Sequence, residues 1–245
     1  MNLPLKNFIT SIAFLIFLIL WSAAIPIIYS LVFFNNSSKM ADHGAKVWAK
    51  FSLWMLKKLC GIDHEILGIK NIPERACIIA CKHQSMWETI VMHLVCKRPV
   101  YVYKKELLKI PFYGWYVARM SGIKLDRKGG ASALKDLIRQ SKKYLAQGQN
   151  IIIFPQGTRV PLNTNSNQYP YQSGIAALYL ACDVEVVPAA LNSGAFWPKS
   201  SALKKSGKIT LEFLEPIKTG LSKQEFMKKL ENATEIESAK LKALI

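Results

Sequence analysis

A long uncharged stretch near the N-terminus limits the possible folds more than any other feature. No charged residue lies between Asn7 and Ser38, and positions 8–34 are almost wholly apolar. About 20 consecutive apolar residues suffice to cross the hydrocarbon core of a bilayer. We therefore expect residues 1–60 to form membrane-anchoring and interfacial helices, and residues 61–245 to form a separate domain.

Two alternatives concern this stretch. Lys6, the apolar run and the small residues of Trp21-Ser-Ala-Ala24 imitate a signal peptide, but the sequence stays apolar from Ile25 to Phe34, beyond the cleavage site that such a peptide would have. This continuation favours a retained membrane segment. Pro26 leaves open a single tilted span or a re-entrant helix pair bent near the proline.

The next segment, residues 45–59, has apolar and aromatic side chains at helical spacing beside lysines. Such a helix either lies in the membrane interface or packs on the domain as an ordinary amphipathic helix. Lysines at 39, 46, 50, 57 and 58 follow the apolar run. By the positive-inside rule they predict that the larger domain faces the cytoplasm.

The remainder of the chain alternates short apolar runs with helical patterns. We expect strands at 62–67, 77–81, 100–103, 123–125, 151–154, 184–191 and 208–214, with the last one a candidate for the sheet edge. We expect helices at 85–95, 113–120, 132–147, 173–182 and after Ser222. This alternation predicts an α/β fold, with a mostly parallel sheet flanked by helices on both faces, attached to the N-terminal membrane-inserted helical segment.

Charge and cysteine content restrict the partners and cofactors. The chain has 33 Lys and Arg against 16 Asp and Glu, a net charge of +17, which indicates an anionic partner. The charge is spread along the chain without a recognition motif, so we expect an anionic membrane and no nucleic acid. The five cysteines show neither Cys-x-x-Cys pairs nor zinc spacing, which predicts reduced core residues and no metal or redox cofactor.

Two motifs suggest chemistry. His83-Gln-Ser-Met-Trp-Glu88 follows the apolar strand at 77–81. A neutral imidazole can remove the proton from an attacking alcohol, and a carboxylate near its other nitrogen would fix the tautomer and stabilise the imidazolium. Ser85 and Glu88 also have the spacing of a capping box at a helix start.

The second motif is Phe154-Pro-Gln-Gly-Thr-Arg159, directly after the β-branched run at 151–153. A strand that ends at Pro and Gly delivers a sharp turn, and ligand-binding loops of α/β sheets lie at such strand ends. Arg159 offers a planar fork suited to phosphate. The Asn-rich stretch at 162–168 predicts a loop beside this site.

Together and in this order, the two motifs resemble the glycerolipid acyltransferase family, in particular bacterial lysophosphatidate acyltransferases. The family patterns are His-x4-Asp and Phe-Pro-Glu-Gly-Thr-Arg. Two weaker family segments are matched by Gly122-Ile-Lys-Leu-Asp-Arg127 and by the apolar strand through Val186-Val-Pro188 to Asn192. The resemblance extends from about Lys82 to Asn192.

The resemblance implies an O-acyltransferase that moves an acyl chain from acyl-CoA or acyl-carrier protein to the free hydroxyl of lysophosphatidate, forming phosphatidate in phospholipid biosynthesis. It implies that His83 is the catalytic base, with Glu88 as its partner. It also implies substrate-binding roles for a set of loop residues: Lys104, Arg127, Gln156, Gly157, Thr158 and Arg159. The expected location is the cell inner membrane, with the catalytic domain, residues 61–245, at the cytoplasmic face and no cofactor.

Three positions depart from the family pattern. Glu88 replaces an aspartate, Gln156 replaces a glutamate, and Gln172 stands where many relatives have a lysine. Relative to the family pattern, Gln156 lacks a negative charge and Gln172 lacks a positive one. We hypothesise either that these two residues interact or that the acceptor head group differs. The alternatives are therefore an acyltransferase for another lysolipid, such as a lyso-aminolipid, or a non-catalytic lipid-binding membrane protein.

Overall fold

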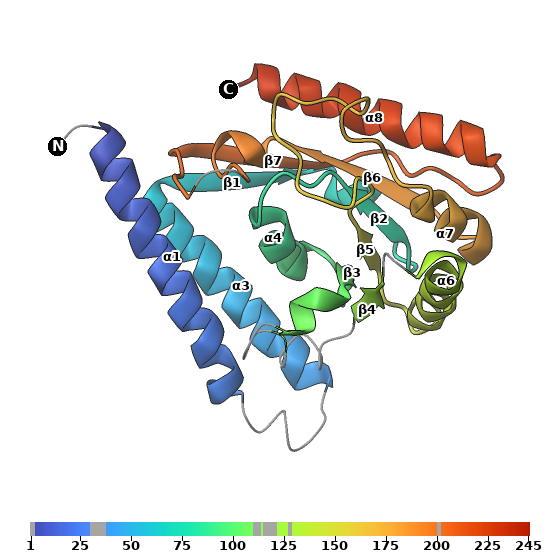
Figure 1. The fold of residues 1–245 in the computed structure, drawn as a ribbon, viewed down its shortest axis with the longest axis horizontal. Coiled ribbons are helices and arrows are strands. Elements are labelled where there is room, and N and C mark those ends of the chain that lie inside the picture. Colours follow the sequence, from blue (N-terminus) through green and yellow to red (C-terminus); the bar gives the residue numbers. More distant parts are fainter. Residues whose placement is uncertain (1–2, 30–37, 110–113, 115–121, 127–128, 200–201) are drawn as a thin grey trace.

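The computed structural model describes residues 3–29, 38–109, 114, 122–126, 129–199 and 202–245. The helix expected at 113–120 and the site residue Arg127 lie outside these ranges, apart from Gly114. Seven strands form one sheet in the order β1-β7-β6-β2-β5-β3-β4 (Figure 1). Their bounds are Ile62–Leu67 (β1), Ile78–Cys81 (β2), Val100–Lys104 (β3), Gly122–Leu125 (β4), Ile151–Ile153 (β5), Val186–Leu191 (β6) and Gly207–Phe213 (β7).

The sheet is mostly parallel, as predicted. Among the pairs of described strands, β6–β7 alone is antiparallel, so β1 and β7 run opposite to the other five strands. The possible edge position of residues 208–214 is wrong, because β7 lies between β1 and β6. Its side chains Ile209, Leu211 and Phe213 are fully buried, whereas Lys208 is exposed. The exposed polar residue suggested an edge strand, although the alternate side chains of this strand belong to the core.

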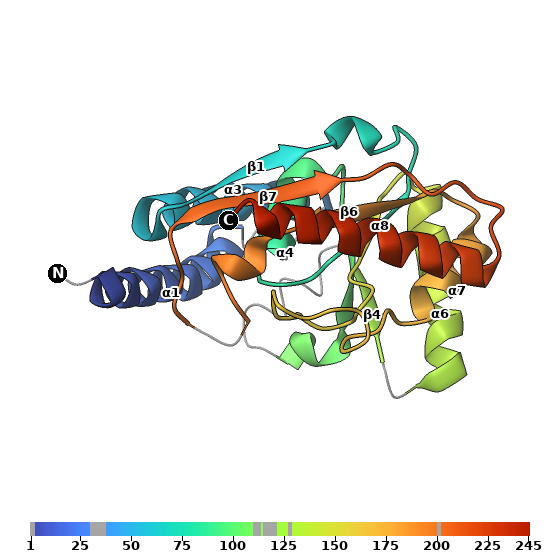
Figure 2. The same cartoon turned by 90° about the horizontal axis from the view of Figure 1, so that it is seen from above.

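Helices cover both faces of the sheet (Figures 1 and 2). They are α1 (Leu3–Ile28), α3 (Ser38–Cys60), α4 (Trp87–Val95), α6 (Gly130–Ala146), α7 (Gly174–Cys182) and α8 (Lys223–Ala243). Successive residues of β2 contribute to two separate cores, because strand side chains alternate between faces. Ile79 belongs to a core shared with α1, α3 and α4, and Ile78 to one shared with α6, α7 and α8.

The N-terminal helices α1 and α3 form an antiparallel pair. The indole nitrogen of Trp21 donates to the carbonyl of Trp48 at 3.2 Å, and that of Trp48 donates to the hydroxyl of Ser22 at 3.1 Å. Helix α1 continues through Pro26 to Ile28, so the helix is not interrupted at the proline. Of the helices described, α1 is the one whose length and composition, over Leu5–Ile28, would allow it to cross a membrane.

This pair is also packed against the sheet. Phe14 and Leu18 of α1, and Leu53 and Leu56 of α3, are buried in the same core as β2. Residue Trp54 of α3 remains 49% exposed, so that helix has one face in the protein and an aromatic face outside it. The division of the chain at residue 60 stays a prediction.

Candidate active site

The two motifs meet at one edge of the sheet. Strands β6, β2, β5, β3 and β4 are neighbours that run in the same direction, so their carboxyl ends lie together. His83 follows β2, Phe154 follows β5, and Lys104 ends β3. Residues that are about seventy positions apart in the chain are therefore adjacent, which is the arrangement that produces ligand sites in open α/β sheets.

His83 and Glu88 form a hydrogen-bonded pair. Nδ1 of His83 lies 2.9 Å from Oε1 of Glu88, whose side chain is completely buried, while the histidine side chain is 16% exposed. The imidazole stacks on the ring of Phe154 with centroids 4.0 Å apart, and the carbonyl of His83 accepts a 2.7 Å hydrogen bond from the amide of Val160. The first motif is thus held directly against the second.

The Glu88 carboxylate accepts hydrogen bonds from four more donors. These are the amides of Gln84 (2.5 Å) and Ser85 (2.7 Å) and the hydroxyls of Ser85 (2.7 Å) and Ser193 (2.9 Å). Burial favours the neutral acid, but the hydrogen bonds from His83 and Ser85 outweigh it and lower the pKa of Glu88 below its usual value. Glu88 is consequently a carboxylate at neutral pH.

The expected capping box at Ser85 is only partly present. The amide of Ser85 donates to the Glu88 carboxylate, but the Ser85 hydroxyl accepts from the amide of Trp87 at 2.9 Å, and the helix begins at Trp87. The same local pattern serves a second purpose here, because it holds the carboxylate beside His83.

Ser193 was not identified from the sequence. It lies in the short 3-10 turn η3 (Ser193–Ala195) after β6, and it is fully buried. In the same turn, the amide of Gly194 donates to Oε1 of Gln84 at 3.0 Å. A β-carbon on Gly194 would lie 3.2 Å from that of Gln84, so the glycine permits this close approach. The only signal in the sequence was the position of Ser193 directly after the family segment that ends at Asn192.

The loop after β5 is a tight turn. The amide of Gly157 donates to the carbonyl of Phe154 at 2.8 Å, and Gly157 has φ of 67°, a backbone region that favours glycine. Nε2 of Gln156 donates to the carbonyl of Tyr169 at 3.3 Å, and its buried Oε1 has no hydrogen-bond partner among the described residues. Gln172 donates from its own side chain to the carbonyl of Pro170, so the two glutamines use different partners.

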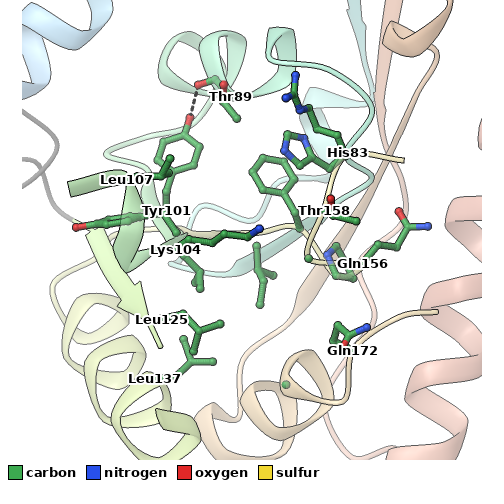
Figure 3. Close-up of a pocket in the computed structure, with 18 of the residues that line it drawn as sticks. His83, Thr89, Tyr101, Lys104, Leu107, Leu125, Leu137, Gln156, Thr158 and Gln172 are labelled. Atoms are coloured by element: carbon green, nitrogen blue, oxygen red, sulfur yellow. Dashed lines mark hydrogen bonds between the residues drawn. The ribbon is translucent and has the colours of Figure 1, made fainter. Parts of the chain in front are cut away.

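These residues open onto a cavity of about 820 Å³. Its lining includes His83, Lys104 and residues 153–159, and it continues to apolar side chains of β4 and α6 and to the N-terminal helix pair. Figure 3 shows Leu125 and Leu137 together at the end away from His83, with Lys104 extending across the cavity toward Thr158. The cavity therefore combines a polar end with a long apolar part, as an amphipathic ligand requires.

The structure brings most of the predicted site residues together. His83, Lys104, Gln156, Gly157, Thr158 and Arg159 all line the cavity, and Glu88 lies behind His83. Sequence reasoning missed Lys199, which lines the same cavity and donates to the hydroxyl of Thr158 at 3.1 Å. It also missed Ile25 and Trp48, which come from the helix pair. The roles of all these residues stay predictions.

Three comparisons place the chain among known proteins. The Acyltransferase family model matches residues 64–192. The 1-acyl-sn-glycerol-3-phosphate acyltransferase of Pseudomonas aeruginosa is 38% identical over 162 residues, which are 66% of this chain and 62% of that protein. The enzyme of the same name from Cocos nucifera is 27% identical over 167 residues, 67% of this chain and 53% of that protein. The chain thus matches between about half and three fifths of the length of these relatives.

A solved structure shares the fold. The crystal structure of the 1-acyl-sn-glycerophosphate acyltransferase from Thermotoga maritima aligns with a TM-score of 0.77 and covers 98% of both chains, at 22% sequence identity. This likeness covers the N-terminal helices as well as the sheet.

Proposed function

Because the chain belongs to the acyltransferase family, we propose that it transfers an acyl chain from a thioester donor to the free hydroxyl of lysophosphatidate, forming phosphatidate. The observation that carries this proposal is the His83–Glu88 pair, whose histidine lines a cavity with one cationic and one apolar end. The names of the relatives from Pseudomonas aeruginosa and Cocos nucifera support the choice of acceptor.

The chemistry follows from the hydrogen bonds of His83. Since the ionised Glu88 only accepts, Nδ1 of His83 carries the proton that joins them, and Nε2 of the neutral ring is the proton acceptor. Nε2 removes the proton of the lysolipid hydroxyl as its oxygen attacks the thioester carbonyl. An ester bond forms, the carbon–sulfur bond breaks, and the imidazolium returns its proton to the leaving thiolate. Glu88 stabilises the imidazolium between these steps.

The head-group end of the cavity supports an anionic acceptor. Lys104, Arg159 and Lys199 line it, and the acidic lining residue Asp126 is paired with Lys105. Lysine and arginine donors bind phosphate through charge-assisted hydrogen bonds, and an arginine can do so with two parallel bonds. In our proposal Lys104 and Arg159 clamp the phosphate, while Gln156, Gly157 and Thr158 shape the loop around it. Arg127 keeps its proposed substrate-binding role on sequence grounds alone.

We also propose that the protein is anchored in the cell inner membrane with its catalytic domain facing the cytoplasm. The outer surface of α1 supports anchoring, because Ile16, Leu20 and Ile27 are each more than half exposed. The net charge of +17 suits an anionic bilayer and an acidic acyl donor, either acyl-CoA or acyl-carrier protein.

One observation favours a second acceptor. Gln156 lines the cavity with a neutral amide where the family pattern has a carboxylate, so the site recognises its acceptor without that negative charge. Acylation of another lysolipid, such as a lyso-aminolipid, is therefore the second candidate. The intact His83–Glu88 pair argues against a non-catalytic lipid-binding protein.

A panel assay tests these proposals. Purified full-length protein is given labelled acyl-CoA or acyl-carrier protein together with lysophosphatidate, lysophosphatidylcholine or a lyso-aminolipid. We expect labelled phosphatidate as the main product. Efficient acylation of the lyso-aminolipid without phosphatidate formation would show that the lyso-aminolipid is the acceptor. If no combination of donor and lysolipid gives a product, the proposal that the protein is an enzyme is overturned.

A further inference from the structure

A buried ion pair on the face of the sheet covered by α8 connects three separate elements. Nζ of Lys82, the residue after β2, lies 2.6 Å from Oε2 of Glu235 on α8. The hydroxyl of Tyr171, in the loop between β5 and α7, donates to Oε1 of the same carboxylate at 3.0 Å. Each oxygen of Glu235 thus has its own partner from a different part of the chain.

The pair is buried enough to be held in one arrangement. The Lys82 side chain is only 4% exposed, the Glu235 side chain 22%, and Tyr171 8%. A lysine at this depth requires a charged partner, because moving an ammonium out of water is otherwise very unfavourable. Glu235 of α8 therefore links Lys82 to Tyr171.

Both partners of Glu235 adjoin the candidate active site. Lys82 precedes His83 in the chain. Tyr171 precedes Gln172, whose backbone amide donates to the carbonyl of Pro155 at 2.9 Å. The loops of His83 and of residues 154–159 already meet at the hydrogen bond between Val160 and His83. The stacked rings of His83 and Phe154 join the same two loops, and the contacts of Glu235 with Lys82 and Tyr171 add an indirect link through α8.

We propose that Glu235 is a positioning residue for acyl transfer: it holds the His83 loop and the 154–159 loop at the separation that the reaction requires. The inference rests on the proposed function, since it concerns the same site. Glu235 itself touches no reacting atom. Its expected effect is on kcat, because small misplacements of a catalytic group slow the chemical step far more than they weaken binding.

The first test compares two conservative substitutions on α8. Glu235→Gln keeps an acceptor and the shape but removes the charge opposite Lys82. We expect kcat to fall roughly tenfold to a hundredfold, while the KM values for lysophosphatidate and for the acyl donor change much less. Glu237→Gln is the matched control, because Glu237 is similarly buried at 18% side-chain exposure and pairs with Lys240, away from the site. Equal activity of the two variants would overturn the proposal.

A second variant separates positioning from simple stabilisation. In Lys82→Met/Glu235→Leu both charges are removed, so no unpaired charge remains buried and the thermal stability should return close to that of the wild type. If Glu235 positions the loops, kcat stays low in this double variant although the fold is restored. Recovery of wild-type kcat together with stability would show that the pair is merely structural.

A third measurement does not depend on activity. Hydrogen exchange of backbone amides in the full-length protein should be faster in Glu235→Gln at Val160, whose amide joins the two loops, and at Gln172, whose amide joins the segment of Tyr171 to Pro155. The Glu237→Gln control should leave both amides as protected as in the wild type. Unchanged protection in Glu235→Gln would overturn the inference. If the wild type acylates no lysolipid but Glu235→Gln still shows this loss of protection, only the proposed function is overturned.

Discussion

Glu88 keeps its charge at a depth where burial alone would neutralise it. Five donors converge on its two oxygens. Burial raises the pKa of this carboxyl, but the hydrogen bond and charge of His83 and the hydrogen bonds from Ser85 outweigh it and lower the pKa. One of them, Ser193, comes from the turn after β6, so the orientation of His83 depends on a distant segment. The longer side chain of Glu88, compared with the family aspartate, is accommodated by this network.

Removing the proposed base should nearly abolish turnover. We expect His83→Ala to lower kcat by roughly a hundred- to ten-thousandfold, the usual contribution of a general base, with the fold intact. Glu88→Gln should cost less than this, since it retains an acceptor for Nδ1 but loses the charge that stabilises the imidazolium. The measurement is steady-state acyl transfer, with circular dichroism as the folding control. A folded His83→Ala protein with wild-type turnover would disprove the mechanism.

Arg159 allows the phosphate clamp to be tested separately. Arg159→Ala should raise the KM for lysophosphatidate by roughly ten- to a hundredfold, because a hydrogen bond to a charged group contributes about 1.5–3 kcal/mol. Arg139→Ala is the control, since Arg139 lies on the exposed side of α6 and pairs with Asp136. An unchanged KM for Arg159→Ala, with an uncharged lysolipid preferred by the wild type, would favour the second candidate acceptor.

At the scale of elements, α1 has two different faces. Phe14 and Leu18 are buried in the protein core, whereas Ile16 and Leu20 are 53% and 65% exposed. An apolar sequence as uniform as this one has little helical periodicity, so it predicted the helix but not which side would contact protein. Contacts with α3, such as those of Trp21 and Trp48, determine the side.

The exposed face of α1 should determine membrane binding. Ile16→Lys/Leu20→Lys places charges on the outer surface, each unfavourable in a membrane helix by about 2.5–3.5 kcal/mol. Flotation with neutral lipid vesicles should show a much smaller bound fraction, at nearly unchanged thermal stability in detergent. Leu180→Lys is the control, since Leu180 is 53% exposed on α7. Equal flotation of the double variant and the wild type would argue against anchoring through this face.

At the scale of the whole molecule, the predicted arrangement of strands and helices holds for most of the chain, because periodicity and turn residues are local signals. The two motifs were expected near each other, since both follow strands of a parallel sheet. Lys199, Ser193 and Glu235 were not foreseen. Their roles depend on which distant segments meet, such as α8 against the loop of Lys82, and no local pattern specifies that contact.

Global stability should depend on pH through His93, which is buried on α4 against Trp48 and Tyr101. Burial, aided by the charge of Lys46, lowers its pKa to about 4. As the pH falls below about 6.5, His93 binds a proton in the unfolded chain but not in the folded protein. The free energy of unfolding therefore decreases until about pH 4.

The loss between pH 7 and pH 5 should be about 2 kcal/mol for this group. Chemical denaturation in detergent measures it in the wild type and in His93→Gln, which does not titrate. The variant should lose less stability than the wild type over this range by about that amount. Parallel pH profiles of the two proteins would show that His93 is protonated equally in both states.

The pairing of β1 with β7 has a consequence for how the protein is made. Ile62 lies opposite Gly207, so β1, the first of the described strands to leave the ribosome, meets its neighbour in the described sheet only after Gly207 has been made. Throughout most of translation β1 presents a free hydrogen-bonding edge next to the apolar helices α1 and α3. The nascent chain therefore needs protection until β7 emerges, and early insertion of α1 into the bilayer would keep that edge away from other unfinished chains.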